Sequence, residues 1–174
     1  MRKLQRALKC FVTACTLLTL SVYAQEDKNL GNPESTHQVG TIPVALSVYK
    51  SPTCGCCAEW ITHVEERHFS TQIHHPRSLA ETKSQLGIDA KYRSCHTAVD
   101  AQGFVFEGHV PAKLISQFLA NPPANALGLS VPGMPAGSPG MEMANTFTPY
   151  PVLLLMKDGS AQIYATIKDQ DQQY

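Results

Sequence analysis

The sequence lacks three features that would each narrow its class at once: a membrane-length apolar run, an excess of positive charge and an internal repeat. The N-terminal apolar stretch, residues 10–22, is shorter than the roughly 20 residues that a membrane-spanning helix requires. Fourteen Lys and Arg residues are balanced by fourteen Asp and Glu residues, so no basic surface for nucleic acid is expected. No segment recurs along the 174 residues, so a repeat architecture is not expected either.

The N-terminal stretch instead has the pattern of an export signal. Four basic residues precede it and small residues surround the change to polar sequence, so residues 1–24 are expected to be a signal peptide cleaved after Ala24. Removal of the signal leaves ten basic and fourteen acidic residues, a formal charge of −4, and no membrane segment. Because an exported protein meets an oxidising compartment, its cysteines are expected to be disulfides, metal thiolates or a redox pair.

The rest of the chain is expected to form one domain. Residues 25–41 are polar and aperiodic, which is typical of a flexible leader. Residues 42–168 suit a single domain with one core, and residues 169–174 are expected to be a polar tail.

Three cysteines, Cys54, Cys56 and Cys57, occupy four positions in this domain. The β-branched and aromatic run before them, residues 44–49, predicts a strand. Apolar residues at roughly helical spacing follow them: Trp60, Ile61, Val64 and Phe69. The thiols are therefore expected at a strand-to-helix turn, where free backbone N–H groups and the helix dipole favour thiolate over thiol.

The pattern downstream predicts further strands and helices. A strand is expected at 71–75, and Ser78 with Glu81 forms a capping box for a helix that Gly87 ends. The other expected elements are strands at 97–99 and 103–106, a helix after Pro111, and a hairpin of 152–156 with 161–166. Residues 128–149 are rich in Gly, Pro and Met and predict a long loop.

A strand, a C-x-x-C turn at Cys54 and Cys57, and a helix are the thioredoxin arrangement. Pro151 would then take the place of the cis-proline opposite the active site. Alternating strands and helices imply parallel strand pairs with right-handed crossovers. We therefore expect an α/β, thioredoxin-like fold with a mixed central sheet flanked by helices and a long Met/Pro/Gly-rich loop.

The cysteines allow three interpretations. A thiol–disulfide oxidoreductase would use Cys54 and Cys57, but Cys56 would then be free to form wrong pairings. A copper centre would use all three together with Cys95, because thiolates bridge Cu(I) ions and support a multinuclear cluster. Two ordinary disulfides are the third interpretation, disfavoured because close spacing strains pairing within the cluster.

Other soft or borderline ligands accompany the cysteines. His96 directly follows Cys95, and both suit copper. For His109, ligation and a structural hydrogen bond are equally good interpretations. Met134 and Met141 lie in a Pro/Gly loop rather than on a periodic apolar element; Cu(I) contact and packing onto the core are equally good interpretations of them.

The motifs together resemble those of the CopG-type copper-resistance proteins. The matching segments are Cys-Gly-Cys-Cys-x-x-Trp at 54–60, Ser-Cys-His-Thr at 94–97, Glu-Gly-His-Val-Pro at 107–111 and Val-Pro-Gly-Met-Pro-x-Gly-Ser-Pro-Gly-Met-Glu at 131–142. This resemblance implies a thioredoxin-like fold, a periplasmic location in a Gram-negative bacterium, and copper bound through Cys54, Cys56, Cys57 and Cys95. It also implies a role in copper tolerance that extends to Cu(I)/Cu(II) conversion.

The favoured hypothesis is thus a periplasmic copper-binding protein, with His96, Met134 and Met141 as further ligands. Its main alternative is an enzyme, a periplasmic thiol–disulfide oxidoreductase using Cys54 and Cys57. A third hypothesis is a chaperone that passes copper to an efflux partner.

Overall fold

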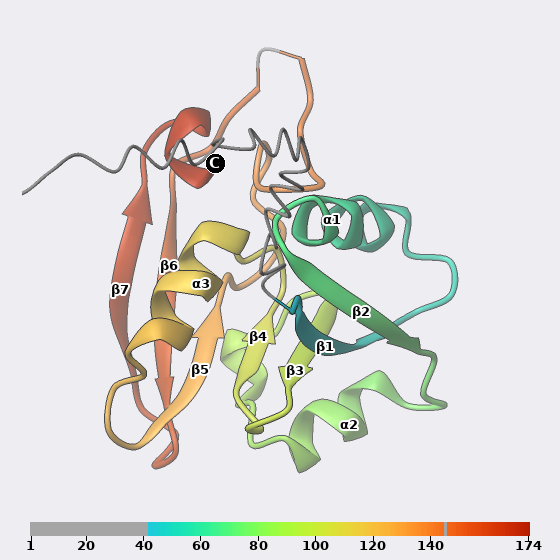
Figure 1. Cartoon of the computed structure of the whole chain (residues 1–174), viewed down its shortest axis with the longest axis vertical. Helices are drawn as coiled ribbons and strands as arrows, with labels where there is room; N and C mark the ends of the chain where they lie inside the picture. The colour runs from blue at the N-terminus through green and yellow to red at the C-terminus, as the bar shows by residue number, and fades with distance from the viewer. Residues whose placement is uncertain (1–41, 145) are drawn as a thin grey trace, which may run out of the picture. The chain divides into compact units, whose positions relative to one another are not determined.

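The computed structural model describes residues 42–144 and 146–174 of the protein (Figure 1). The expected signal peptide and leader lie outside these residues. The elements are β1 Val44–Lys50, α1 Gly55–Glu65, β2 Phe69–His74, α2 Leu79–Gln85, η1 Ala90–Tyr92, β3 His96–Asp100, β4 Val105–Glu107, α3 Ala112–Ala120, β5 Ala126–Ser130, β6 Tyr150–Met156, β7 Ala161–Ile167 and η2 Gln170–Gln173. Among the described helices, none has the length and apolarity to span a bilayer.

Seven strands form one mixed sheet in the order β2-β1-β3-β4-β5-β6-β7. The pairs β1–β2 and β4–β5 are parallel, as their intervening helices require, and the other four pairs are antiparallel. The predicted mixed sheet flanked by helices is confirmed; its description as thioredoxin-like stays a prediction.

Side chains alternate between the two faces of the sheet and form two apolar clusters. Helices α1 and α3 pack on one face in the larger cluster, whose biggest members, Trp60, Phe106 and Phe118, are fully buried. A smaller cluster around Ile88 and Val105 lies on the other face, between the sheet and the segment that follows α2. Both faces of the central strands are therefore buried.

Two predicted boundaries are wrong. Phe69 belongs to β2 and not to the first helix, because His68 adopts a φ of 65°, which ends the helical turn. The loop predicted for residues 128–149 begins too early, because residues 128–130 belong to β5. A Cβ at Gly128 would lie 1.8 Å from the Val105 carbonyl oxygen, so this glycine marks a bulge where two backbones approach closely.

The peptide bond before Pro151 is trans, so the expected cis-proline is wrong. Pro151 lies inside β6, opposite Thr166 of β7. Residues 169–174, predicted to be a polar tail, pack onto the folded domain: η2 includes Gln173, whose side chain is fully buried.

Candidate metal centre

The first turn of α1 carries three cysteines. Cys54 is the N-cap residue and has extended backbone dihedral angles, but no side chain caps the helix. The Cys54 amide donates to the Ser51 carbonyl over 3.2 Å, which fixes the turn after β1. Because the first N–H groups of an α-helix have no partner within the helix, this end of α1 stabilises negative charge on the sulfurs beside it.

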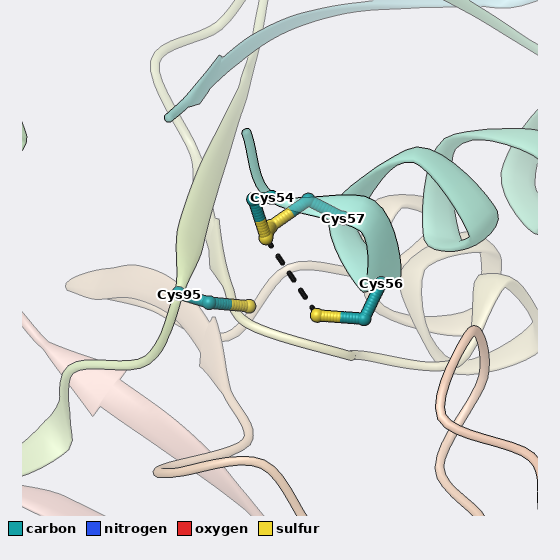
Figure 2. Close-up of side chains that lie close together, drawn as sticks. All are labelled: Cys54, Cys56, Cys57 and Cys95. Carbon is teal, nitrogen blue, oxygen red and sulfur yellow. Dashed lines mark hydrogen bonds between the residues drawn. A yellow bond between two sulfur atoms is a disulfide. The ribbon is translucent and has the colours of Figure 1, made fainter. Parts of the chain in front are cut away.

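The fourth cysteine reaches the cluster through the sheet. β1 and β3 are antiparallel neighbours, and Lys50 pairs with His96, so Cys95, directly before β3, lies beside the turn after β1. The four sulfur atoms all lie within 4.8 Å of one another. In Figure 2 the thiols of Cys56 and Cys95 point toward each other from opposite elements.

Cys54 and Cys57 form a disulfide, while Cys56 and Cys95 are free thiols. The expectation that close spacing disfavours pairing within the cluster is therefore wrong for this pair. One helical turn places the two Cα atoms 5.4 Å apart, inside the usual range for a disulfide. The Cys56 sulfur lies 3.6 Å from the Cys54 sulfur. A site of four thiolates is available only after this disulfide has been reduced.

Two histidines border the Cys95 sulfur. His96 Nδ1 lies 3.3 Å from it and His109 Nε2 lies 3.0 Å from it. His109 Nδ1 is 2.7 Å from the Pro139 carbonyl oxygen, which only accepts, so Nδ1 carries the proton and donates. The Nε2 lone pair of neutral His109 consequently faces Cys95, the tautomer that a metal ligand needs.

His96 is fully buried and its Nε2 has no hydrogen-bond partner among the described residues. Its ring packs against the indole of Trp60 at a centroid distance of 4.4 Å and against His109 at 5.1 Å. Cys95, His96 and His109 form a second group of possible ligands within 4.8 Å, and it shares Cys95 with the first. The donor set of thiols and neutral imidazoles fits a soft metal ion.

Burial sets the protonation of these groups. It raises the pKa of Cys95 to about 11, and the nearby Cys56 adds to this effect. Burial also lowers the pKa of His96 well below its usual value and lowers the pKa of His109. At neutral pH the imidazoles are neutral and the Cys95 thiol is protonated, so a metal that binds this sulfur must displace its proton.

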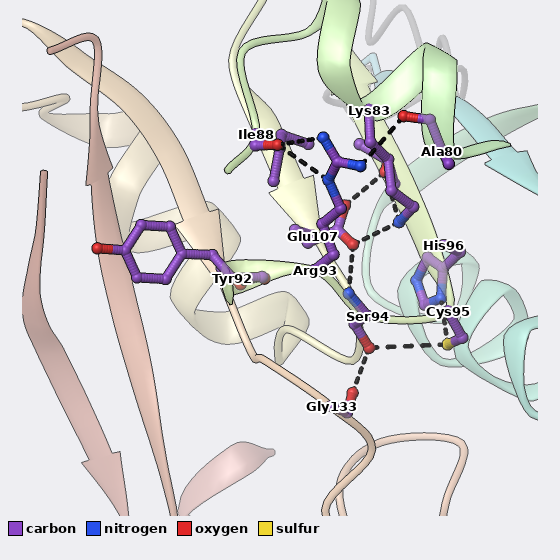
Figure 3. A network of polar contacts seen from close by, with 12 residues as sticks. Ala80, Lys83, Ile88, Tyr92, Arg93, Ser94, Cys95, His96, Glu107 and Gly133 are labelled. Atoms are coloured by element: carbon purple, nitrogen blue, oxygen red, sulfur yellow. Dashed lines mark hydrogen bonds and ion pairs between the residues drawn. The ribbon is translucent and has the colours of Figure 1, made fainter. Parts of the chain in front are cut away.

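A buried polar network holds the backbone beside Cys95 (Figure 3). Lys83 of α2 and Glu107 of β4 form an ion pair that is almost inaccessible to solvent. Lys83 also donates to the Thr97 hydroxyl over 3.0 Å, and the Ser94 amide donates to Glu107 over 2.6 Å. The network thus ties α2, β3 and β4 together and holds the backbone of Ser94, next to Cys95.

The loop after β5 lies over the helix start. A Cβ on Gly140 would come within 2.8 Å of the Cys56 carbonyl oxygen and 2.5 Å of the Trp60 amide nitrogen, so only glycine fits there. Ser94 donates through its hydroxyl to the Gly133 carbonyl, which ties the start of the loop to the Cys95 segment. Met134 is 55% exposed and Met141 is half-buried. Their role as copper ligands stays a prediction.

The structure therefore brings together the four predicted cysteines and His96. It adds His109, which the sequence left undecided, and the ion pair of Lys83 with Glu107, which the sequence did not suggest. The adjacent Gly108 and Pro111 already marked His109 as a residue in a constrained turn. Nothing in the pattern of α2 distinguishes Lys83 from an exposed lysine.

Comparisons with known proteins find one matching family model and two similar solved structures. Residues 92–141 match a family model described as "Protein of unknown function, DUF411". Two solved structures, copper resistance protein CopG form 1 and form 2, are each 39% identical to this chain with a TM-score of 0.68. They cover 73% and 72% of this chain, and the matches span 99% and 98% of theirs. Among curated proteins, none matches the chain.

Proposed function

Because this chain belongs to the CopG family of copper-resistance proteins, we propose that it binds copper as Cu(I) through Cys54, Cys56, Cys57 and Cys95. The observation that carries the proposal is the convergence of four sulfur atoms within 4.8 Å at a helix N-terminus. Thiolate sulfur is a soft ligand that favours Cu(I), and four bridging thiolates can hold more than one ion. The neutral imidazoles of His96 and His109 complete the ligand set.

Loading begins with reduction of the Cys54–Cys57 disulfide. Two electrons and two protons from a dithiol reductant convert the disulfide into two thiols, and the reductant leaves as a disulfide. Each thiol then loses its proton when its sulfur ligates copper. The helix N-terminus stabilises the thiolates of the first turn, and His109 presents Nε2 toward Cys95.

The dithiol of Cys54 and Cys57 also supports a more specific proposal, that the protein reduces Cu(II) to Cu(I). Two Cu(II) ions would each take one electron from the thiols of Cys54 and Cys57, which would lose two protons and form their disulfide. Cys56, Cys95 and the imidazoles would then remain as ligands for the Cu(I) produced. The closure of only one pair among four cysteines supports this division of roles.

We assign Met134 and Met141 to the outer part of the site. Thioether sulfur binds Cu(I) without forming disulfides, and the exposure of Met134 suits a residue that first meets the ion. We place the protein in the periplasm, on the strength of the signal sequence, where the task would be copper resistance.

A second candidate function, thiol–disulfide oxidoreductase, is favoured by one observation. In the Cys54–Cys57 disulfide the first sulfur belongs to a half-exposed residue and the second to a fully buried one. That asymmetry suits attack on Cys54 by an external thiolate, with Cys57 as the leaving thiolate.

Anaerobic titration of the reduced protein with Cu(I), in competition with a chromophoric chelator, separates the two functions. We expect Cys56→Ser and Cys95→Ser to weaken binding by more than the roughly 10- to 100-fold typical of losing a partner of a ligand. Ser78→Ala, which removes the N-cap hydrogen bond of α2, is the control and should bind like wild type. Unchanged binding in both cysteine variants would refute the thiolate site. Insulin reduction that needs Cys54 but neither Cys56 nor Cys95 would favour the oxidoreductase.

A further inference from the structure

The C-terminal residues make an unusual set of contacts for a polar tail. Gln173 is fully buried and uses both ends of its amide. Its Nε2 donates to the Gly137 carbonyl over 2.7 Å, and its Oε1 accepts from the Tyr150 hydroxyl over 2.6 Å. A buried amide with two satisfied hydrogen bonds joins the tail firmly to the loop after β5.

Tyr174 holds the same loop a few residues further along. Its hydroxyl donates to one carboxylate oxygen of Glu142 over 2.6 Å, and the other oxygen of Glu142 accepts from the Gly140 amide over 2.7 Å. The Tyr174 ring also meets His63 of α1 edge-on at a centroid distance of 5.6 Å, and the guanidinium of Arg67, in the turn after α1, lies 4.9 Å from the ring centroid. The tail therefore joins the loop to α1.

The loop residues between these two anchors are the ones that touch the metal centre. Pro139 accepts the hydrogen bond that fixes the tautomer and orientation of His109, and Gly140 lies against the backbone of Cys56. Figure 1 shows η2 (red) and this loop (orange) at the same end of the sheet, where β6 begins. A continuous series of contacts thus runs from the tail through the loop to His109 and Cys95.

We propose that Gln173 and Tyr174 are positioning residues of the metal centre, which act by holding the loop so that His109 presents Nε2 to Cys95. This inference rests on the proposed copper site for its functional consequence. Loss of the Gln173 amide leaves the Gly137 carbonyl without its donor, and the described residues of the surrounding loop form no helix or strand. Once the loop loosens, Pro139 no longer fixes the imidazole of His109.

The first test is Cu(I) affinity of the reduced, full-length protein. We expect Gln173→Met, which keeps the side-chain length but removes both hydrogen bonds, to weaken Cu(I) binding by about 10- to 100-fold. Tyr174→Phe removes a single hydrogen bond and should weaken binding less. In a His109→Gln background, Gln173→Met should have no further effect. Equal weakening in both backgrounds, or wild-type affinity in Gln173→Met, would overturn the proposal.

The second test needs no copper and so separates this inference from the proposed function. Nitrogen-15 NMR of the histidine rings in the metal-free protein should show the Nδ1-protonated tautomer of His109 in wild type. Gln173→Met should shift His109 toward a mixture of tautomers, while the control Ser78→Ala leaves it unchanged. An unaltered His109 signal in Gln173→Met would refute the positioning role even if copper binding fails in every protein.

Discussion

The Cys95 sulfur borders two groups of possible ligands, the other three cysteines and the pair of histidines. Its thiol is protonated at neutral pH because burial raises its pKa to about 11. The neighbouring His109 accepts at Nε2, so a thiol proton and a lone pair face each other over 3.0 Å. A bound cation would replace that proton without a change in the tautomer of His109.

A second prediction concerns a single residue, His63, and the dependence of the protein's stability on pH. Its Nε2 accepts from the Ala112 amide at the start of α3, and burial, with help from Arg67, lowers its pKa to about 4. The folded state therefore binds this proton less readily than the unfolded chain, whose histidine pKa is near 6.5. The stabilisation is complete above pH 6.5 and is lost as the pH falls toward 4. At pH 5 the loss is about 2 kcal/mol.

Urea unfolding at a series of pH values between 7 and 4 measures this loss. In His63→Gln the decline in unfolding free energy should be smaller by about 2 kcal/mol at pH 5, since glutamine accepts from Ala112 without titrating. His96 and His109, whose pKa values are also lowered by burial, contribute to the decline that remains. Parallel pH profiles for wild type and His63→Gln would contradict the assignment.

At the scale of elements, the site depends on how α2, β3 and β4 are fastened together. Lys83 reaches from α2 to Glu107 of β4, and Glu107 accepts from the Ser94 amide beside Cys95. The Lys83 side chain is 4% exposed and that of Glu107 is fully buried. Neither charge is tolerable there without the other, because desolvation of an unpaired ion is strongly unfavourable.

Lys83→Met should therefore destabilise the fold by about 3–5 kcal/mol, because it leaves the Glu107 carboxylate buried and unpaired. The double variant Lys83→Met/Glu107→Gln removes both charges and should recover a large part of that loss. Chemical denaturation of the two variants and wild type at pH 7 provides the comparison. If the double variant is as unstable as Lys83→Met, the ion pair is not the source of the effect.

The elements were predictable where local patterns decide them. Ser78 caps α2 by accepting from the Glu81 amide over 3.1 Å, as the capping-box sequence indicates. β5 was not fully predicted because Gly128 interrupts its strand pattern. The glycine is needed because the backbone of Val105 in β4 approaches it closely, which the local sequence does not reveal. The burial of Lys83 was equally invisible, since it depends on Glu107, 24 residues away.

At the scale of the whole molecule, the metal centre too could be predicted only in part from the sequence. Sequence spacing was enough to group Cys54, Cys56 and Cys57, whereas Cys95 and His96 were predicted from their soft-ligand chemistry and from the family resemblance. Two further facts depend on tertiary contacts that no local pattern encodes: the orientation of His109 by Pro139 and the anchoring of the loop by Gln173. Pairing of Cys54 with Cys57 was misjudged because strain was inferred from sequence spacing alone, whereas the helical turn sets their separation.

The redox state of this disulfide should control how much copper stabilises the whole molecule. With the disulfide closed, only Cys56, Cys95 and the two imidazoles are available, whereas reduction supplies two more thiolates. Since a ligand that binds only the folded state adds RT ln(1 + [L]/Kd), free Cu(I) at a thousand times Kd adds about 4 kcal/mol. We therefore expect a large rise in Tm on adding Cu(I) to reduced protein and a clearly smaller rise for the oxidised protein.

Scanning calorimetry under nitrogen, with Cu(I) buffered by a weak chelator, makes this comparison on one preparation in two redox states. Cys54→Ser/Cys57→Ser is the matched variant: it lacks the disulfide and both thiols, so its Tm should respond to Cu(I) as the oxidised wild type does, whatever the redox buffer. Equal responses of oxidised and reduced wild type would mean that Cys54 and Cys57 take no part in binding. The site would then shrink to Cys56, Cys95 and the histidines, and the disulfide would be a structural bond of α1.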